Sequence, residues 1–306
     1  MTKVTFEELL EAGCHFGHLK RKWNPAMAPY IFMEKNGIHI IDLYKTADQL
    51  ELACAAARQI AKSGRKILFV ATKKQAKEAV AEIVKAIGMP YVTERWPGGM
   101  LTNFFTIRKA VKKMTDIDRL IQSPQFNNLS KREKLQIQRE RAKLEKNLGS
   151  IADLSRLPAA VFIVDIMKEH IAVAEARRLN IPTFAIVDTN SNPNLIDYPI
   201  PANDDASKSI SLIVNAVCQA IVEGMEERKM NKDLNPEEMN EKEFGGEFDL
   251  EHEGEEDDFI TNDEDEKGKK KRGTEGEDDG APKRKRTTVK KAPAKTATTK
   301  TAPKKR

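Results

Sequence analysis

Three short apolar runs, separated by segments with a helical pattern, restrict the fold of this chain more than any other feature. The runs cover residues 67–72 (ILFVAT), 159–164 (AAVFIV) and 183–187 (TFAIV). Each run is continuous rather than alternating, which is typical of a strand buried on both faces. The sequence therefore predicts an α/β fold, with a mainly parallel, doubly wound sheet that helices cover on both faces.

Polar residues follow these runs, at the strand ends where parallel sheets usually carry their function. Thr72, Lys73 and Lys74 follow the first run, Asp165 follows the second and Asp188 follows the third. A strand-to-helix turn with lysines could bind a phosphate through helix-terminal amides. However, the chain has neither a GxxxxGK[ST] nor a GxGxxG pattern, so an RNA phosphate explains these lysines better than a mononucleotide does.

Residues 104–148 interrupt this alternation of strands and helices. Apolar residues recur at helical spacing on both sides of a break near Pro124, and Ser130 with Glu133 forms a capping box for the second helix. The pattern predicts an inserted antiparallel coiled-coil hairpin that projects from the sheet. Lys and Arg outnumber Asp and Glu in it, which favours RNA contact over a solvated surface balanced by its own acidic residues.

Charge divides the chain into three regions. Residues 1–231 contain 34 Lys and Arg against 26 Asp and Glu, residues 232–266 contain 2 against 17, and residues 267–306 contain 16 against 4. We predict an α/β domain over 1–231 and a disordered tail, acidic over 232–266 and basic over 267–306, because the tail has too few large apolar side chains to form a core. Such a basic tail is typical of polyanion binding, although a solubilising role also explains it.

The cysteines and the N-terminus bear on the compartment. Cys14, Cys54 and Cys218 are far apart and fit neither a disulfide framework nor a zinc ribbon. Residues 1–13 form an acidic amphipathic pattern rather than a signal peptide, and no apolar run approaches the length of a membrane span. We expect a cytoplasmic protein without a membrane partner.

Two groups of residues have the chemistry of metal ligands. His15 and His18 lie beside glycines in an irregular segment, where a satisfied or RNA-facing pair is more common than a metal site. Asp188, Asp204 and Asp205 could meet at the sheet edge and hold a divalent cation, but Asp before a helix or in a turn ordinarily acts as a cap. We predict no metal, no cofactor and no catalytic residue.

Basic residues interleaved with aromatic rings are the clearest chemical signal. Lys and Arg neutralise phosphates, and aromatic rings stack on unpaired bases. We expect the loop RWPGGMLTN, residues 95–103, to present Arg95 and Trp96 on a Pro-Gly-Gly turn and to start the next helix at Thr102 or Asn103. The predicted RNA-binding residues are Lys20, Arg21, Lys22, Trp23, Asn24, Lys73, Lys74, Arg95, Trp96, Asn103, Arg108, Lys109, Lys112 and Lys113.

Five long segments carry a family resemblance. They are AGCHFGHLKRKWNPAMAPYIF, GIHIIDLYKT, FVATKKQA, ERWPGGMLTNF and IPTFAIVDTNSNPNLIDYPIPANDDASKSI. Taken in order, they resemble the bacterial small-subunit ribosomal protein S-two family over residues 4–225. The resemblance implies a flavodoxin-like sheet with an inserted coiled-coil hairpin and no enzyme activity. It also implies a place in the ribosome, contact with small-subunit rRNA and with other small-subunit proteins, including the large mRNA-binding protein S-one, and no small-molecule substrate.

Two other functions stay open at this point. An α/β enzyme acting on a phosphorylated substrate would use Lys73, Lys74 and Asp188 near the switch point of the sheet. Saturable binding of a small phosphorylated ligand to the RNA-free protein would favour that reading. A non-ribosomal adaptor would instead bind proteins through the hairpin and the tail, and would keep its partners after nuclease treatment.

Overall fold

The computed structural model describes residues 4–234, and its main sheet is the predicted one. The strands are all parallel and lie in the order β5-β4-β6-β7-β8. The three apolar runs form β4, β6 and β7, which are buried along their whole length. The predicted α/β fold is therefore confirmed. The strands span β4 (Ile67–Val70), β5 (Tyr91–Val92), β6 (Ala160–Val164), β7 (Thr183–Val187) and β8 (Tyr198–Pro201).

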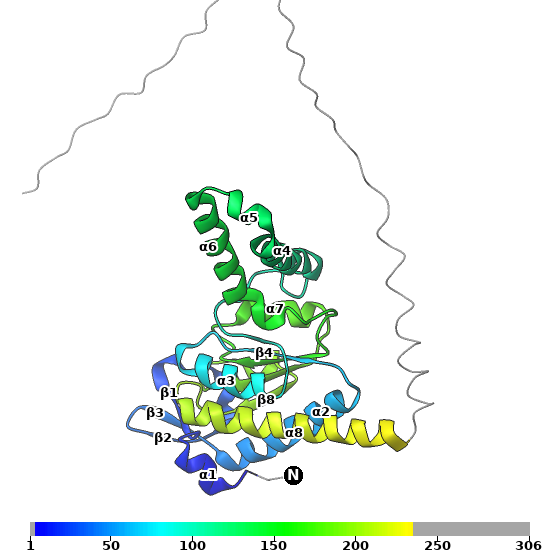
Figure 1. The fold of residues 1–306 in the computed structure, drawn as a ribbon. Helices are drawn as coiled ribbons and strands as arrows, with labels where there is room; N and C mark the ends of the chain where they lie inside the picture. Colours follow the sequence, from blue (N-terminus) through cyan, green and yellow to red (C-terminus); the bar gives the residue numbers. More distant parts are fainter. Residues whose placement is uncertain (1–3, 235–306) are drawn as a thin grey trace, which may run out of the picture. The chain divides into compact units, whose positions relative to one another are not determined.

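Helices cover both faces of this sheet (Figure 1). On one face, Phe69, Phe162 and Phe184 pack beneath three helices. On the other face, Val161 and Ile163 pack against one helix and the base of the 104–148 insertion. Because successive strand residues point to opposite faces of the sheet, each continuous apolar run contributes side chains to the cores on both faces. The helices of the first face are α2 (Leu43–Lys62), α3 (Lys74–Ala86) and α8 (Ser207–Leu234), and that of the second is α7 (His170–Arg178).

The outer strand β8 has an unusual edge. Ala202 donates its backbone N–H to the carbonyl of Val187 in β7 at 3.1 Å. Because backbone groups alternate in direction along a strand, Pro199 and Pro201 stand where an N–H would point away from the sheet. The carbonyl of Pro201 accepts a hydrogen bond of 2.6 Å from the Thr46 hydroxyl of α2. The two prolines thus lie in a short edge strand, the position in a sheet that tolerates proline.

A second, antiparallel sheet precedes the parallel one, in the order β1-β3-β2. We expected an irregular segment around His15 and His18, which is wrong, because β1 (Phe16–Leu19) lies there; β2 (Ile31–Lys35) and β3 (Ile38–Ile41) follow it. Both pairings shift register, and this breaks the alternation that marks a strand. Asn36 and Gly37 link β2 to β3 with positive φ angles of 54° and 74°, which is the Asn-Gly hairpin signal that could have revealed them.

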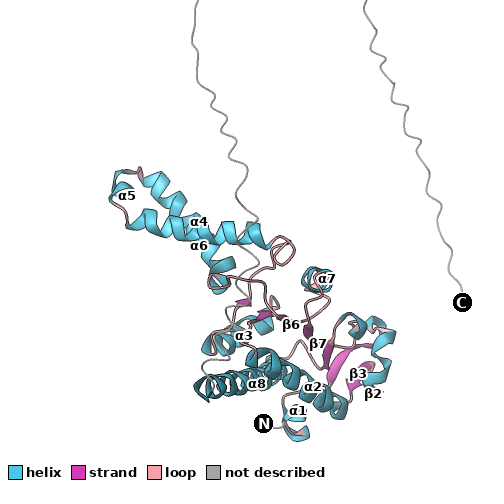
Figure 2. Cartoon of the chain, turned by 90° about the vertical axis from the view of Figure 1, so that its right-hand side faces the viewer, coloured by secondary structure: helices cyan, strands magenta, loops and turns pink. Residues whose placement is uncertain are grey.

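The insertion forms a helical hairpin that extends away from the parallel sheet (Figure 2). Its long helices are α4 (Phe104–Gln122) and α6 (Lys131–Leu148), and the capping box of Ser130 with Glu133 is present. The break between them is a short helix, α5 (Pro124–Asn128), rather than a polar turn alone. Met114 and Ile117 are buried in the contact between the two long helices.

The N-terminal helix α1 (Phe6–Glu11) begins with a capping box formed by Thr5 and Glu8. The last helix, α8, continues to Leu234. Within residues 4–234, Ser207–Asn231 is long and apolar enough to cross a membrane by length and composition, contrary to our expectation, and half of its apolar window is buried. It packs as a core helix between α2 and α3. The predicted tail lies outside the described residues from 235 onward.

Candidate nucleic-acid interface

The segment with the first basic and aromatic cluster is held against the turn that follows β7. The His18 backbone donates to the Thr189 hydroxyl at 2.8 Å, and the Asn24 backbone donates to the Thr189 carbonyl at 2.8 Å. Gly17 lies so close to this turn that a Cβ would meet Thr189 Cγ2 at 2.6 Å. A glycine is therefore required there, and both ends of the segment are anchored.

Between these anchors, the predicted cations face solvent. The Trp23 ring is 37% exposed and lies 5.2 Å from the His39 ring. Asn24 differs from the expectation, because its side chain accepts the Ala26 N–H at 2.9 Å and caps a short 3-10 helix, η2 (Pro25–Tyr30). The exposed members of the cluster are Lys20, Arg21, Lys22 and Trp23.

Lys73 does not face solvent in the way that a phosphate ligand would. Its Nζ lies 2.8 Å from Asp204, 2.7 Å from Asp205 and 3.4 Å from Asp165, and its side chain is only 12% exposed. Burial alone would lower the pKa of Lys73, but hydrogen bonds to Asp204 and Asp205 raise it above its usual range. The structure thus assigns Lys73 to an internal ion cluster, while its neighbour Lys74 is exposed.

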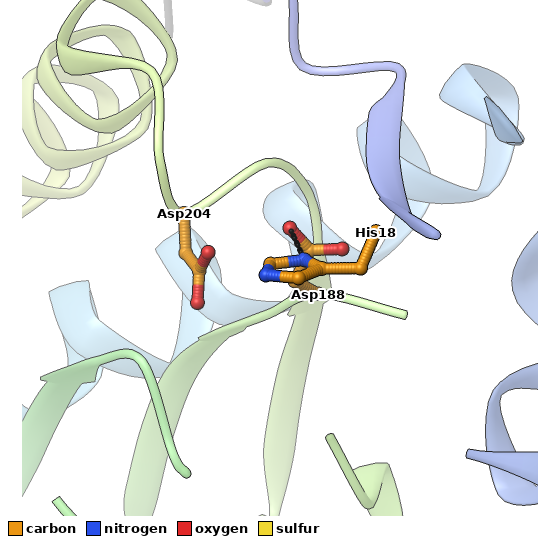
Figure 3. Close-up of side chains that lie close together, drawn as sticks. All are labelled: His18, Asp188 and Asp204. Carbon is orange, nitrogen blue, oxygen red and sulfur yellow. Dashed lines mark ion pairs between the residues drawn. The ribbon is translucent and has the colours of Figure 1, made fainter. Parts of the chain in front are cut away.

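His18, Asp188 and Asp204 complete this cluster (Figure 3). His18 Nδ1 lies 3.0 Å from Asp188, and the three side chains offer one ligand atom each within 4.8 Å of one another. Asp204 is fully buried, and its Oδ2 has no hydrogen-bond partner among residues 4–234. One imidazole and two carboxylates could hold a divalent cation. His15 is not part of this group, because its ring packs 3.9 Å from Phe16.

Charge and burial control titration in the cluster. Burial, together with the charges of Asp188 and Asp165, raises the pKa of Asp204 to about 7 although Lys73 opposes this. Asp204 and Asp205 do not take the capping role that we expected, and the residue before them, Asn203, forms an Asx turn in which its Oδ1 accepts the Asp205 N–H at 2.8 Å. The reason is that Lys73 already engages both carboxylates.

The loop RWPGGMLTN is built around a single carboxylate, that of Glu175 in α7. Glu175 accepts hydrogen bonds from the Trp96 indole at 3.1 Å, from the backbone of Gly99 at 2.8 Å and of Leu101 at 3.0 Å, and from the Thr102 backbone and hydroxyl at 3.1 Å. Burial alone would raise the pKa of Glu175, but these backbone bonds hold it below its usual range. The carboxylate thereby fixes the start of α4.

Our expectation that this loop presents both Arg95 and Trp96 therefore needs correction. Arg95 is exposed, but Trp96 is only 6% exposed and belongs to the core on the hairpin side of the sheet. Its ring fills an apolar site, and its N–H is satisfied by Glu175. The signal that we missed is an acidic residue beside Ala172 and Ala176 on the buried stripe of a helix, where a carboxylate needs donors.

Comparison with known proteins identifies the family. Residues 9–224 match the model of a family described as "Ribosomal protein S2". The chain belongs to this family. It is 69% identical over 232 residues to small ribosomal subunit protein uS2 of Porphyromonas gingivalis, which covers 76% of this chain and 83% of the relative. It is 70% identical over 237 residues to the protein of the same name from Azobacteroides pseudotrichonymphae, covering 78% and 90%.

Membership of the ribosomal protein S2 family settles the broad function. The chain is a structural protein of the small ribosomal subunit, acts in translation and is not an enzyme. This confirms the resemblance noted in the sequence, and it removes the phosphorylated-substrate enzyme and the non-ribosomal adaptor from consideration. The remaining predicted residues are all exposed: Asn103 is the N-cap of α4, and Arg108, Lys109, Lys112 and Lys113 lie on α4.

Proposed function

We propose that the chain binds small-subunit rRNA through exposed cations, by phosphate neutralisation and shape rather than by reading base edges. The observation that carries this proposal is the free charge on α4. Arg108, Lys109 and Lys112 are exposed and take part in no ion pair among residues 4–234. Exposed cations that no carboxylate neutralises are the groups that replace counterions on a phosphate backbone.

Elsewhere on the hairpin, acidic residues do neutralise their neighbours. Lys113 pairs with Glu140 at 2.5 Å, and Arg119 lies 3.6 Å from Asp116. Residues 104–148 nevertheless contain 12 Lys and Arg against 5 Asp and Glu. A surface balanced by its own acidic residues would not leave this excess, which supports RNA as the partner.

Replacing both Arg108 and Lys112 with alanine is expected to weaken rRNA binding and to flatten its salt dependence. Each lost phosphate contact lowers the slope of log K against log salt by about 0.7–0.9. Filter binding of the full chain to transcribed small-subunit rRNA at several salt concentrations measures both quantities. Arg119→Ala, which removes a paired cation, is the matched control and should change the slope less. Equal slopes for the double variant and the unchanged chain would contradict the proposal.

For protein partners, including S-one, we infer a role for an exposed apolar patch at the end of the molecule that carries α1. Phe32 is 69% exposed and Tyr44 is 70% exposed, and they line a cavity with Phe6, Leu10 and Met33. Contiguous exposed apolar side chains on a soluble protein are typical of a protein contact. This supports a second type of interface, distinct from the cationic one.

A Phe32→Ser variant is expected to assemble into small subunits that retain several-fold less S-one, because the contact loses apolar area. Quantitative mass spectrometry of purified subunits measures the ratio of S-one to this chain. Leu52→Ser is the control, since Leu52 is also exposed, at 57%, but is not part of the patch. Unchanged S-one occupancy in the Phe32 variant would exclude the patch as its contact.

We also infer a flavodoxin-like sheet and a coiled-coil hairpin. The order β5-β4-β6-β7-β8 corresponds to 2-1-3-4-5 when the parallel strands are counted along the chain, which supports the flavodoxin-like type. The buried seam between α4 and α6 supports the coiled coil. The division into a domain over 1–231 and a tail that is acidic and then basic remains part of this proposal.

A further inference from the structure

One aromatic ring at the base of the hairpin has no role in the core. Phe105 is 67% exposed, whereas its neighbour Phe104 packs against the core on the hairpin side of the sheet. The Lys109 Nζ lies 4.4 Å from the centre of the Phe105 ring. Arg108 and Lys112 stand three and seven positions after Phe105, so all four side chains share one face of α4.

We propose that this face, formed by Phe105, Arg108, Lys109 and Lys112, binds an unpaired RNA nucleotide, with the ring stacked on the base and the cations on the flanking phosphates. The inference rests on the proposed rRNA binding and deepens it, because it names the form of RNA that the base of the hairpin takes. Phe105 was not among the residues predicted from the sequence.

The chemistry of the face favours an unpaired nucleotide over a duplex. Bases inside a helix stack on one another, and only a bulged, looped or terminal base has a free face for an aromatic ring. Stacking tolerates any base, so the contact adds no reading of base edges. The Lys109 stem is flexible, and its ammonium can leave the ring for a phosphate when a base arrives.

A second ring on the hairpin provides an internal comparison. Phe126 in α5 also has a lysine above it, with Lys134 Nζ 5.7 Å from the ring centre, but its side chain is only half-exposed. Lys134 is also engaged with the Asn127 carbonyl at 3.0 Å. Of the two pairs, that of Phe105 presents the larger free surface.

The test uses the full chain and three variants, Phe105→Ala, Phe105→Trp and Phe126→Ala. The first probe is transcribed small-subunit rRNA. The second is an RNA stem with 2-aminopurine in a single-stranded loop, compared with a fully paired stem of the same length. Because Phe105 is exposed, its replacement should leave the unfolding temperature unchanged, and circular dichroism checks this.

We expect Phe105→Ala to lower rRNA affinity about tenfold, as loss of one stacked base does, with an unchanged salt slope. Phe105→Trp should retain the affinity, and Phe126→Ala should resemble the unchanged chain. The unchanged chain and Phe105→Trp should quench the loop 2-aminopurine, and Phe105→Ala should not. This pattern separates stacking from the charge effect of Arg108 and Lys112.

Several results would overturn the inference. If Phe105→Ala binds rRNA like the unchanged chain, the ring does not stack, although the proposed rRNA binding stands. Equal losses on the looped and paired probes would show that the ring supports the helix instead. Loss of a ribosomal protein from the variant subunits, with RNA binding intact, would assign this face to a protein. If the unchanged chain fails to bind rRNA at all, the proposed function itself fails.

Discussion

Replacing Glu175 by alanine is expected to lower the free energy of unfolding by about 3–5 kcal/mol, since removing a buried acceptor leaves each donor unsatisfied. Glu175 accepts five hydrogen bonds from the Trp96 indole, from the backbone of Gly99, Leu101 and Thr102, and from the Thr102 hydroxyl. No other carboxylate is bonded to these donors among the hydrogen bonds of residues 4–234. Urea denaturation followed by circular dichroism measures the loss.

A matched control and the pH dependence sharpen this experiment. Glu82→Ala removes an exposed acidic residue of α3 and should change stability by less than about 0.5 kcal/mol.

Because the folded pKa of Glu175 is lowered, the contribution of Glu175 to the free energy of unfolding is present above its ordinary pKa and is lost as pH falls through the folded value. The unchanged chain should therefore lose more stability on acidification than Glu175→Ala does. Parallel pH profiles would contradict this account.

The second large effect is expected from Lys73→Ala, at about 3–5 kcal/mol, because it leaves buried carboxylates without their cation. Lys73 neutralises Asp165 after β6 and the adjacent Asp204 and Asp205 in the loop between β8 and α8. Thermal unfolding of the full chain measures the change. Lys74→Ala is the control, since Lys74 has the same charge, is adjacent and is exposed.

A double variant distinguishes charge from packing in that result. Adding Asp165→Asn to Lys73→Ala removes one of the uncompensated buried charges and should restore part of the lost stability. If the double variant is as unstable as the sum of the two single variants, the loss comes from the lysine stem rather than from its charge. If Lys73→Ala and Lys74→Ala have equal stability, the internal cluster does not stabilise the fold.

The parallel sheet and the hairpin could be predicted because their signals are local. Continuous apolar runs and helical spacing act within a few residues of the chain, and they identified β4, β6 and β7 as well as α4 and α6. The antiparallel sheet was missed because its two pairings shift register. Its Asn36-Gly37 turn was the local signal that remained.

The candidate site was less predictable, because burial depends on distant partners. The exposed hairpin cations Arg108 and Lys112 follow from helix geometry alone. The burial of Trp96 and Lys73 could not be predicted in this way, because their partners Glu175 and Asp204 lie 79 and 131 positions away along the chain. A tryptophan beside a Pro-Gly-Gly turn looks the same in sequence whether it faces a ligand or a buried carboxylate.

The edge of β8 has a consequence for copies of the chain that have not yet joined a ribosome. An open strand edge lets identical molecules add to one another and aggregate. In β8, Pro199 and Pro201 lack the backbone N–H groups that would point outward from the sheet. The Thr46 hydroxyl already donates a hydrogen bond to the Pro201 carbonyl. This edge therefore offers another copy of the chain no proline N–H donor and one carbonyl that is already engaged, so we expect unassembled copies to add to one another here less readily than at an open strand edge.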